Sequence, residues 1–160
     1  MITLKSAREI EAMDKAGDFL ASIHIGLRDL IKPGLDMWEV EEYVRRRCKE
    51  ENFLPLQIGV DGAMMDYPYA TCCSLNDEVA HAFPRHYILK DGDLLKVDMV
   101  LGGPIAKSDL NVSKLNFNNV EQMKKYTQSY SGGLADSCWA YAVGTCLLYT
   151  SDAADDMQWV

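Results

Sequence analysis

The chain has 160 residues, of which 48% are hydrophobic. This length fits one domain, and this apolar content excludes a disordered chain. The formal net charge of −8 argues against nucleic acid as a substrate or partner, because phosphate binding requires clustered Lys and Arg. No stretch has the length of a membrane span and the first residues do not form a signal peptide, so we expect a cytoplasmic protein with no membrane partner.

Five cysteines are spread along the chain. An odd number without an export signal indicates reduced thiols, which also favours the cytosol. Cys72 and Cys73 lie near His81 and His86 in the sequence, but this spacing differs from that of zinc knuckles. We therefore do not expect a zinc site there.

Two amphipathic helices are predicted in the first 50 residues. Ser6 and Glu9 have the pattern of a capping box, and the apolar residues after them recur at helical spacing as far as the Lys-Pro-Gly break at residues 32–34. Asp36 and Glu39 have a second capping-box pattern. The second apolar stripe consists of Met37, Val40, Val44 and Cys48. Three arginines at residues 45–47 lie among glutamates, so we expect them on a solvated helix face.

From residue 53 onward, Gly and Pro separate short β-prone runs, which predicts short strands at residues 69–74 and 79–83. An Asp-Gly turn at residues 89–93 then leads into a longer strand at residues 94–101. Two helices followed by several strands predict an α+β fold.

Asp98 lies in the middle of the longer strand. Strand alternation places it on the same face as Lys96 and Val100. A lone carboxylate in a buried strand is costly unless its charge is compensated. An arginine, a set of N–H donors or a metal ion would each serve, and the strand pattern leaves these three alternatives open.

A polar stretch follows at residues 107–130, and its composition predicts a surface excursion with a short helix at residues 120–126. The next predicted strand, at residues 134–144, contains a second aspartate, Asp136. If the two strands pair antiparallel, Asp98 and Asp136 can meet, and a divalent cation between them would relieve their repulsion. The alternative is that each aspartate caps a turn or pairs with an arginine.

Several segments together resemble the type I methionine aminopeptidases, in a streptococcal-like variant with an insertion, over residues 4–145. They are the Lys-Pro-Gly break, Tyr67-Pro68 followed by Cys72, residues 74–84, residues 89–93 and Val97-Asp98. The segment at residues 74–84 is the most specific. It departs modestly from the family, because Asp77 is slotted in and Ala82-Phe83 replace the usual Gly-Ile.

The resemblance implies the pita-bread fold, of which this chain would be the N-terminal half. It implies a monomeric enzyme of the cytoplasm that removes the initiator methionine from nascent proteins, with the ribosome as a place of action. Two divalent metal ions (Co, Mn, Fe, Zn or Ni) would assist hydrolysis of the first peptide bond. By position, Asp98 and Asp136 are similar to the metal ligands, and His81 to the catalytic histidine that contacts the scissile amide. Tyr67 and Cys72 are similar to walls of the methionine pocket, although both also fit an ordinary core.

The choice of Asp136 needs an insertion. The family places its two aspartates a tight hairpin apart, whereas Asp98 and Asp136 are 38 residues apart (136 − 98 = 38). Asp109 has the more usual spacing, but the sequence that follows Asp136 is more similar to the family. We therefore expect residues 104–133 to be an insertion within the metal-site hairpin, which costs little stability.

The remaining ligands of the family, a histidine and two glutamates, come from the second half of its fold. Residues 137–160 contain neither residue type. We therefore expect residues 1–145 to be the N-terminal half of a catalytic domain, inactive alone and active in its full-length parent. The alternative function is a non-catalytic pita-bread protein that binds a peptide or a ribosomal partner. The joint presence of His81, Asp98 and Asp136 favours the enzyme.

Residues 146–160 lack the helix pattern with which the family continues. The run from Cys146 to Asp156 resembles the translation of an adapter used in sequencing libraries. We expect residues 146–160 to be foreign, and the alternative is a natural, unrelated tail. The codons at the junction distinguish the two.

Overall fold

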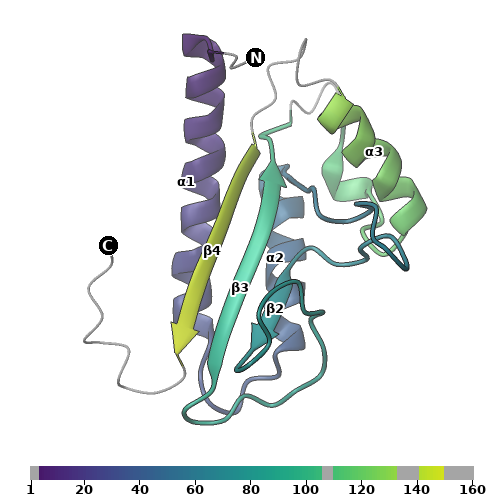
Figure 1. Ribbon diagram of the computed structural model, residues 1–160. Coiled ribbons are helices and arrows are strands. Elements are labelled where there is room, and N and C mark those ends of the chain that lie inside the picture. Colours follow the sequence, from purple (N-terminus) through teal and green to yellow (C-terminus); the bar gives the residue numbers. More distant parts are fainter. Residues whose placement is uncertain (1–3, 106–109, 133–140, 150–160) are drawn as a thin grey trace.

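A four-stranded sheet and two long helices form the framework of the computed structural model, which describes residues 4–105, 110–132 and 141–149 (Figure 1). In chain order the elements are α1 (Ala7–Leu30), α2 (Trp38–Glu51), β1 (Leu54–Pro55), β2 (Cys72–Leu75), β3 (Leu94–Gly102), the 3-10 helix η1 (Val112–Lys114), α3 (Val120–Gly132) and β4 (Tyr141–Tyr149). β1, β2 and β4 all pair with β3 in antiparallel fashion. The predicted α+β class is confirmed.

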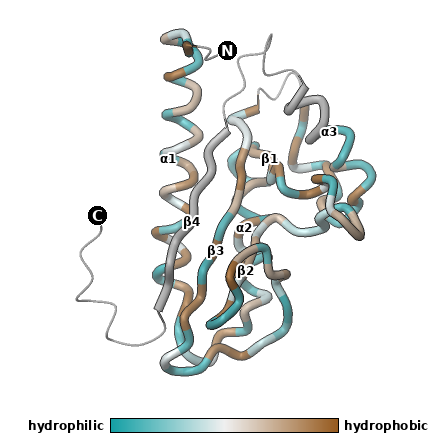
Figure 2. The backbone as a smooth tube through the Cα atoms, in the orientation of Figure 1, coloured by the Kyte–Doolittle hydropathy of each residue, from teal (hydrophilic) through white to brown (hydrophobic). Residues whose placement is uncertain are grey.

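β3 has one buried face and one half-buried face. Its buried residues are Leu95, Val97, Met99 and Leu101, which belong to the same core as the apolar residues of α1 and α2. Asp98 lies on the other face with Lys96 and Val100, as the alternation predicts, and Figure 2 shows the resulting change between hydrophobic and hydrophilic segments along this strand. Asp98 is therefore half-buried at the sheet surface, and its desolvation costs less than that of a carboxylate inside the core.

α1 begins with the predicted capping box. The Ser6 hydroxyl accepts from the Glu9 backbone N–H, and the Glu9 carboxylate accepts from the Ser6 N–H. Its buried residues are Ala16, Phe19, Leu20, Ile23 and Leu27. Ile10 and Met13 belong to the predicted stripe but are 57% and 43% exposed, because the first turns of α1 extend beyond the start of β4 (Figure 1). In the described part of the chain, no helix has the length and hydropathy needed to cross a bilayer.

α2 has the predicted buried stripe, with Met37, Val40, Val44 and Cys48 fully buried. The second capping box is not formed. The Asp36 carboxylate accepts from the backbone N–H groups of Trp38 and Tyr87, both at 3.1 Å, and contacts His86 Nδ1 at 2.7 Å. A β-bridge between Asp36 and Ile88 brings residues 86–88 to the start of α2. The Asp36 carboxylate therefore bonds to His86 and Tyr87 instead of the N–H of Glu39.

Three predictions about the strands need correction. Residues 79–83 are not a strand, because His81 has a left-handed backbone (φ 58°) that extended pairing does not tolerate. β2 begins at Cys72, not at residue 69. β4 runs to Tyr149, beyond the predicted end at residue 144, because the β-prone residues 145–149 continue the pairing with β3.

The excursion, defined as residues 104–133, is not purely a surface segment. α3 is present where a short helix was predicted and is longer than expected. Five apolar residues in the described part of the excursion are buried in the common core: Ile105, Val112, Leu115, Phe117 and Met123. Because the composition of the excursion is polar overall, the sequence did not indicate that these residues are buried.

Glu41 and Arg45 form a buried ion pair in α2, which corrects the expectation that all three arginines lie on a solvated face. Glu41 is completely buried, and its carboxylate accepts from Arg45 Nε at 2.5 Å. It also accepts from the backbone N–H groups of Ala70 and Thr71 and from the Thr71 hydroxyl, at 2.6–2.9 Å. The pair therefore ties α2 to the segment that leads into β2.

Replacing Glu41 tests this tie. In Glu41→Ala, the Arg45 guanidinium and two backbone N–H groups lose their acceptor, and we expect the free energy of unfolding to fall by about 3–5 kcal/mol. Glu42→Ala, which removes the exposed neighbouring carboxylate, should change it by less than about 0.5 kcal/mol. Urea unfolding followed by circular dichroism measures both. Equal losses in the two variants would contradict this role for Glu41.

Candidate metal and substrate site

Asp98 and Cys72 occupy directly paired positions of β3 and β2. Paired positions of antiparallel strands place their side chains on the same face, with Cβ atoms about 5 Å apart. Burial raises the pKa of the Cys72 thiol, and the negative charge of Asp98 raises it further. Cys72 is therefore a neutral thiol at pH 7, and Gln57 Nε2 donates to its sulfur at 3.1 Å.

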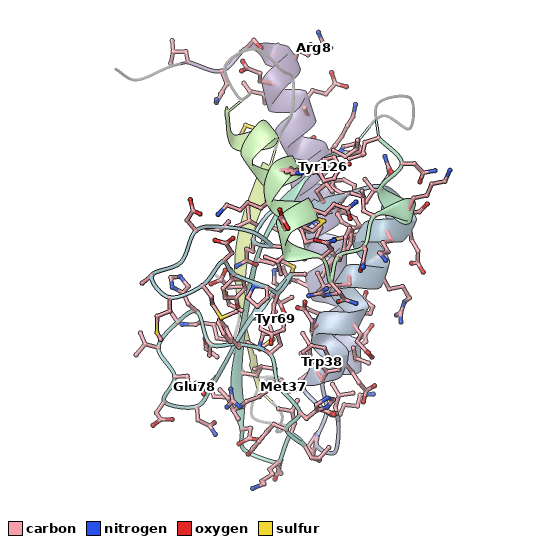
Figure 3. The ribbon with its side chains drawn as sticks, turned by 90° about the vertical axis from the view of Figure 1, so that its right-hand side faces the viewer. Arg8, Met37, Trp38, Tyr69, Glu78 and Tyr126 are labelled. Carbon is pink, nitrogen blue, oxygen red and sulfur yellow. The ribbon has the colours of Figure 1, made fainter. Side chains whose placement is uncertain are left out.

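Tyr67 lies at the edge of a group of aromatic rings. Its ring centroid is 5.2 Å from that of Phe83 and 6.0 Å from that of Tyr69. Tyr69 in turn lies beside Trp38 of α2, at 5.9 Å (Figure 3). Burial is the main reason why the pKa of Tyr67 is raised, and its protonated hydroxyl donates to the Thr71 carbonyl at 2.9 Å. These contacts hold Tyr67 next to Cys72.

His81 is exposed and lies in the segment that follows β2. The residue after it, Ala82, is anchored to β2, because its carbonyl accepts from the Cys73 N–H at 2.9 Å and its N–H donates to Ser74 Oγ at 3.4 Å. His81 and Asp98 thus flank β2 on opposite sides. Their backbones are two strand spacings apart, about 10 Å.

Asp136 and its rival Asp109 both lie outside the described residues. In the pairing of β3 with β4, the position opposite Asp98 belongs to Thr145. The structure therefore brings together Asp98, Cys72, Tyr67 and the His81 segment. The predicted meeting of the two aspartates stays a prediction.

The site offers oxygen atoms that a cation would satisfy. Among the described residues, the buried Gln57 Oε1 has no hydrogen-bond partner, and the Asp98 carboxylate lies close enough to Cys72 to raise the pKa of its thiol. Both residues adjoin Cys72, and carboxylate and amide oxygens are ligands of hard divalent cations. Asp98 therefore fits the role of one metal ligand. In the part of the chain that the structure describes, no group of three or more His, Cys, Asp or Glu residues could hold an ion by itself.

Two supporting residues were missed by the sequence analysis. Glu41 holds the backbone of residues 70–71, and Arg45 donates to the Pro68 carbonyl at 2.9 Å. Together they fix both sides of the segment that carries Tyr69 and adjoins Tyr67. Their spacing of four residues within a predicted helix was the available signal, although it does not reveal that the pair is buried.

The comparisons with known proteins agree on one family. Residues 11–104 match metallopeptidase family M24. Among curated relatives, the methionine aminopeptidase of Aquifex aeolicus is 34% identical over 100 residues, covering 61% of this chain and 39% of the relative. Methionine aminopeptidase 1 of Bacillus subtilis is 31% identical over 144 residues, covering 90% of this chain and 46% of the relative.

Solved structures agree with this comparison. A methionine aminopeptidase from Streptococci is 86% identical with a TM-score of 0.81, covering 96% of this chain and 53% of that one. The methionine aminopeptidase of Thermotoga maritima is 38% identical with a TM-score of 0.58, covering 63% of this chain and 39% of that one. The chain thus spans about half the length of the proteins it matches, and these neighbours confirm the pita-bread fold. Because the family match extends over more than half of its residues, the chain belongs to metallopeptidase family M24.

Proposed function

We propose that the full-length protein to which this chain corresponds is a methionine aminopeptidase, a hydrolase that removes the N-terminal methionine of nascent proteins. The similarity to the streptococcal enzyme carries this proposal, because it extends over nearly the whole chain. The juxtaposition of Asp98, Cys72 and Tyr67 supports it. This chain, which holds only part of the ligand set, is inactive alone in this proposal.

Membership in a metallopeptidase family implies a divalent metal cofactor, and we assign Asp98 as one of its ligands. Such an ion would act as a Lewis acid on the scissile carbonyl. We assign Asp136 as a second ligand, and two ions as the complement, from the resemblance. In the described register Thr145 stands opposite Asp98, nine residues beyond Asp136 (145 − 136 = 9), so this assignment requires a different register of β4.

The chain's own residues would act on the peptide. Tyr67 and the neutral thiol of Cys72 form an apolar wall that suits a thioether side chain, since neither carries a charge at pH 7. The exposed imidazole of His81, anchored through Ala82, can donate a hydrogen bond to oxygen as negative charge develops on the scissile carbonyl.

We also propose that residues 104–133 are an insertion in a hairpin of the family fold. β3 and β4 are antiparallel neighbours, which a two-residue turn can join, yet residues 103–140 connect them. The family match ends at residue 104, where the excursion begins. Both observations support the insertion.

Three free, buried thiols, Cys48, Cys72 and Cys73, suit a reducing compartment and support a cytoplasmic location. We also propose that the full-length enzyme acts at the ribosome and is a monomer. The origin of residues 146–160 in an adapter also remains a prediction.

The activity is tested with Met-Ala peptides and added Mn²⁺ or Co²⁺. We expect turnover by the full-length enzyme and none by this chain, because the remaining ligands lie beyond it. Asp98→Asn in the full-length enzyme should lower kcat/KM at least about 1000-fold, since one neutral ligand replaces a charged one. A wild-type full-length enzyme that is inert with every divalent metal would refute the proposal.

His81 is tested by its effect on kcat. We expect His81→Ala in the full-length enzyme to lower kcat about 100- to 1000-fold, because a donor to the developing negative charge is lost. His86→Ala serves as the control, since His86 is exposed and contacts Asp36 instead. Steady-state kinetics of both variants decide the matter, and similar losses in both would remove the special role of His81.

The proximity of Asp98 and Cys72 is tested without catalysis. Because Asp98 raises the pKa of the Cys72 thiol, Asp98→Asn should lower that pKa and increase the thiolate fraction. At pH 8 we expect iodoacetamide to alkylate Cys72 about two- to fivefold faster, as measured by mass spectrometry. Cys73, whose pKa burial raises to about 12, is the internal reference. Asp91→Asn, at an exposed turn, should leave the rate unchanged.

A further inference from the structure

The excursion contacts the loop that carries Tyr67. Lys124 of α3 donates to Asp61 Oδ1 at 2.6 Å and to both carboxylate oxygens of Asp66 at 3.0 and 3.1 Å. Asp66 is the residue directly before Tyr67. One ammonium group thus links α3 to both sides of a short loop.

Two backbone hydrogen bonds close this loop. The Gly59 N–H donates to the Tyr67 carbonyl at 2.8 Å, and the Tyr67 N–H donates to the Val60 carbonyl at 2.9 Å. Lys124 therefore holds a loop whose closing bonds include the backbone of Tyr67 itself. The position of the Tyr67 ring and the attachment of the loop to α3 are consequently coupled.

Gly59 allows α3 to approach closely. It has a φ of 86°, and a Cβ atom at this position would lie 2.5 Å from Lys124 Cα and 2.6 Å from Lys124 N. The two backbones are in direct contact, so any other residue at position 59 would displace α3 or the loop.

A second connection lies on the other side of Tyr67. Arg45 Nη1 donates to Asn118 Oδ1 of the excursion at 2.8 Å, while Nη2 donates to the Pro68 carbonyl. The excursion is also anchored in the core through Phe117 and Met123, which are 2% and 0% exposed. A core-anchored segment thus contacts Asp66, just before Tyr67, and is linked through Arg45 to Pro68, just after it.

We propose that the excursion is a positioning element for the substrate pocket and that Lys124, through Asp61 and Asp66, holds Tyr67 in place as a wall for the methionine side chain. This inference rests on the proposed function. The excursion stands at the end of β3 that leads into it (Figure 1), and this role does not require Lys124 to touch substrate. Lys124 is a positioning residue, not a catalytic one.

Lys124 and Asp61 both carry their charge at neutral pH. The carboxylates of Asp61 and Asp66 raise the pKa of Lys124, and Lys124 lowers the pKa of Asp61. The lysine therefore stays protonated and Asp61 stays ionised between about pH 5 and pH 10. Asp61 is largely exposed, so salt screens its contact more than the contact of the half-buried Asp66.

The test compares Lys124→Met, Lys124→Arg and Lys125→Met in the full-length enzyme. For Lys124→Met we expect hydrogen exchange of the Gly59 and Tyr67 amides to accelerate about two- to fivefold. We expect KM for Met-Ala peptides to rise by a similar factor while kcat changes less than about twofold. Lys124→Arg should restore both values, and Lys125→Met, which alters an exposed neighbour on α3, should change neither.

The outcomes separate this inference from the proposed function. If the wild-type enzyme does not cleave Met-Ala peptides, the proposed function fails, and the pocket role of the excursion fails with it even where exchange accelerates. If the enzyme is active but Lys124→Met leaves amide exchange unchanged, or lowers kcat without changing KM, the positioning role is overturned. An effect on KM that shrinks at about 0.5 M salt would support it, because screening weakens the same bridge.

Discussion

One strand serves two incompatible environments, and the rest of the structure depends on it. β3 must bury Leu95, Val97, Met99 and Leu101 against two helices while it presents Asp98 on the opposite face. The two-residue period of a strand permits this only if every neighbour keeps its register, since a slip by one residue exchanges the faces. Its three pairing partners therefore position the core and the site at the same time.

The burial of Glu41 shows how the structure positions the site. A carboxylate removed from water costs several kcal/mol, and it persists only where donors replace the water. Here an arginine, two backbone N–H groups and a hydroxyl all point to Glu41. Three of these four donors belong to residues 70–71, so the cost of burial is offset by fixing the segment between Tyr67 and Cys72. The ion pair is thus better understood as a device for position than as a source of net stability.

The framework was predictable because its signals are local. The capping box at Ser6, the stripe of α2 and the alternation of β3 each depend on residues within a few positions of one another. Relations over long distances in sequence were not predictable. Asp36 has a capping pattern, but a bridge to Ile88 redirects its carboxylate, and nothing near residue 36 in the sequence announces residue 88.

The same distinction applies to the site. The positions of Tyr67, Cys72 and His81 followed from a resemblance, and the structure brings the first two together with Asp98. Phe83, where the chain departs from the family, packs against Tyr67 at 5.2 Å between ring centroids. The bridge from Lys124 to Asp61 and Asp66 joins residues about 60 positions apart, and a polar composition cannot show which of its charges will meet.

The register of β4 is the clearest case of missing local information. A tight turn fixes the register of a hairpin. A connection as long as residues 103–140 does not fix it, so the register depends on how the two strands fit each other. Residues 146–149 are apolar or aromatic, and β3 pairs with them at Leu94 to Val97. With residues 146–149 paired to Leu94–Val97, Thr145 stands opposite Asp98. Placing Asp136 opposite Asp98 would instead require a shift of β4 by nine positions (145 − 136 = 9). Because nine is an odd number, this shift would also exchange the two faces of β4. In the register that the structure has, the β4 residue paired with Asp98 is therefore Thr145, and the proposed meeting of Asp98 with Asp136 belongs to another register.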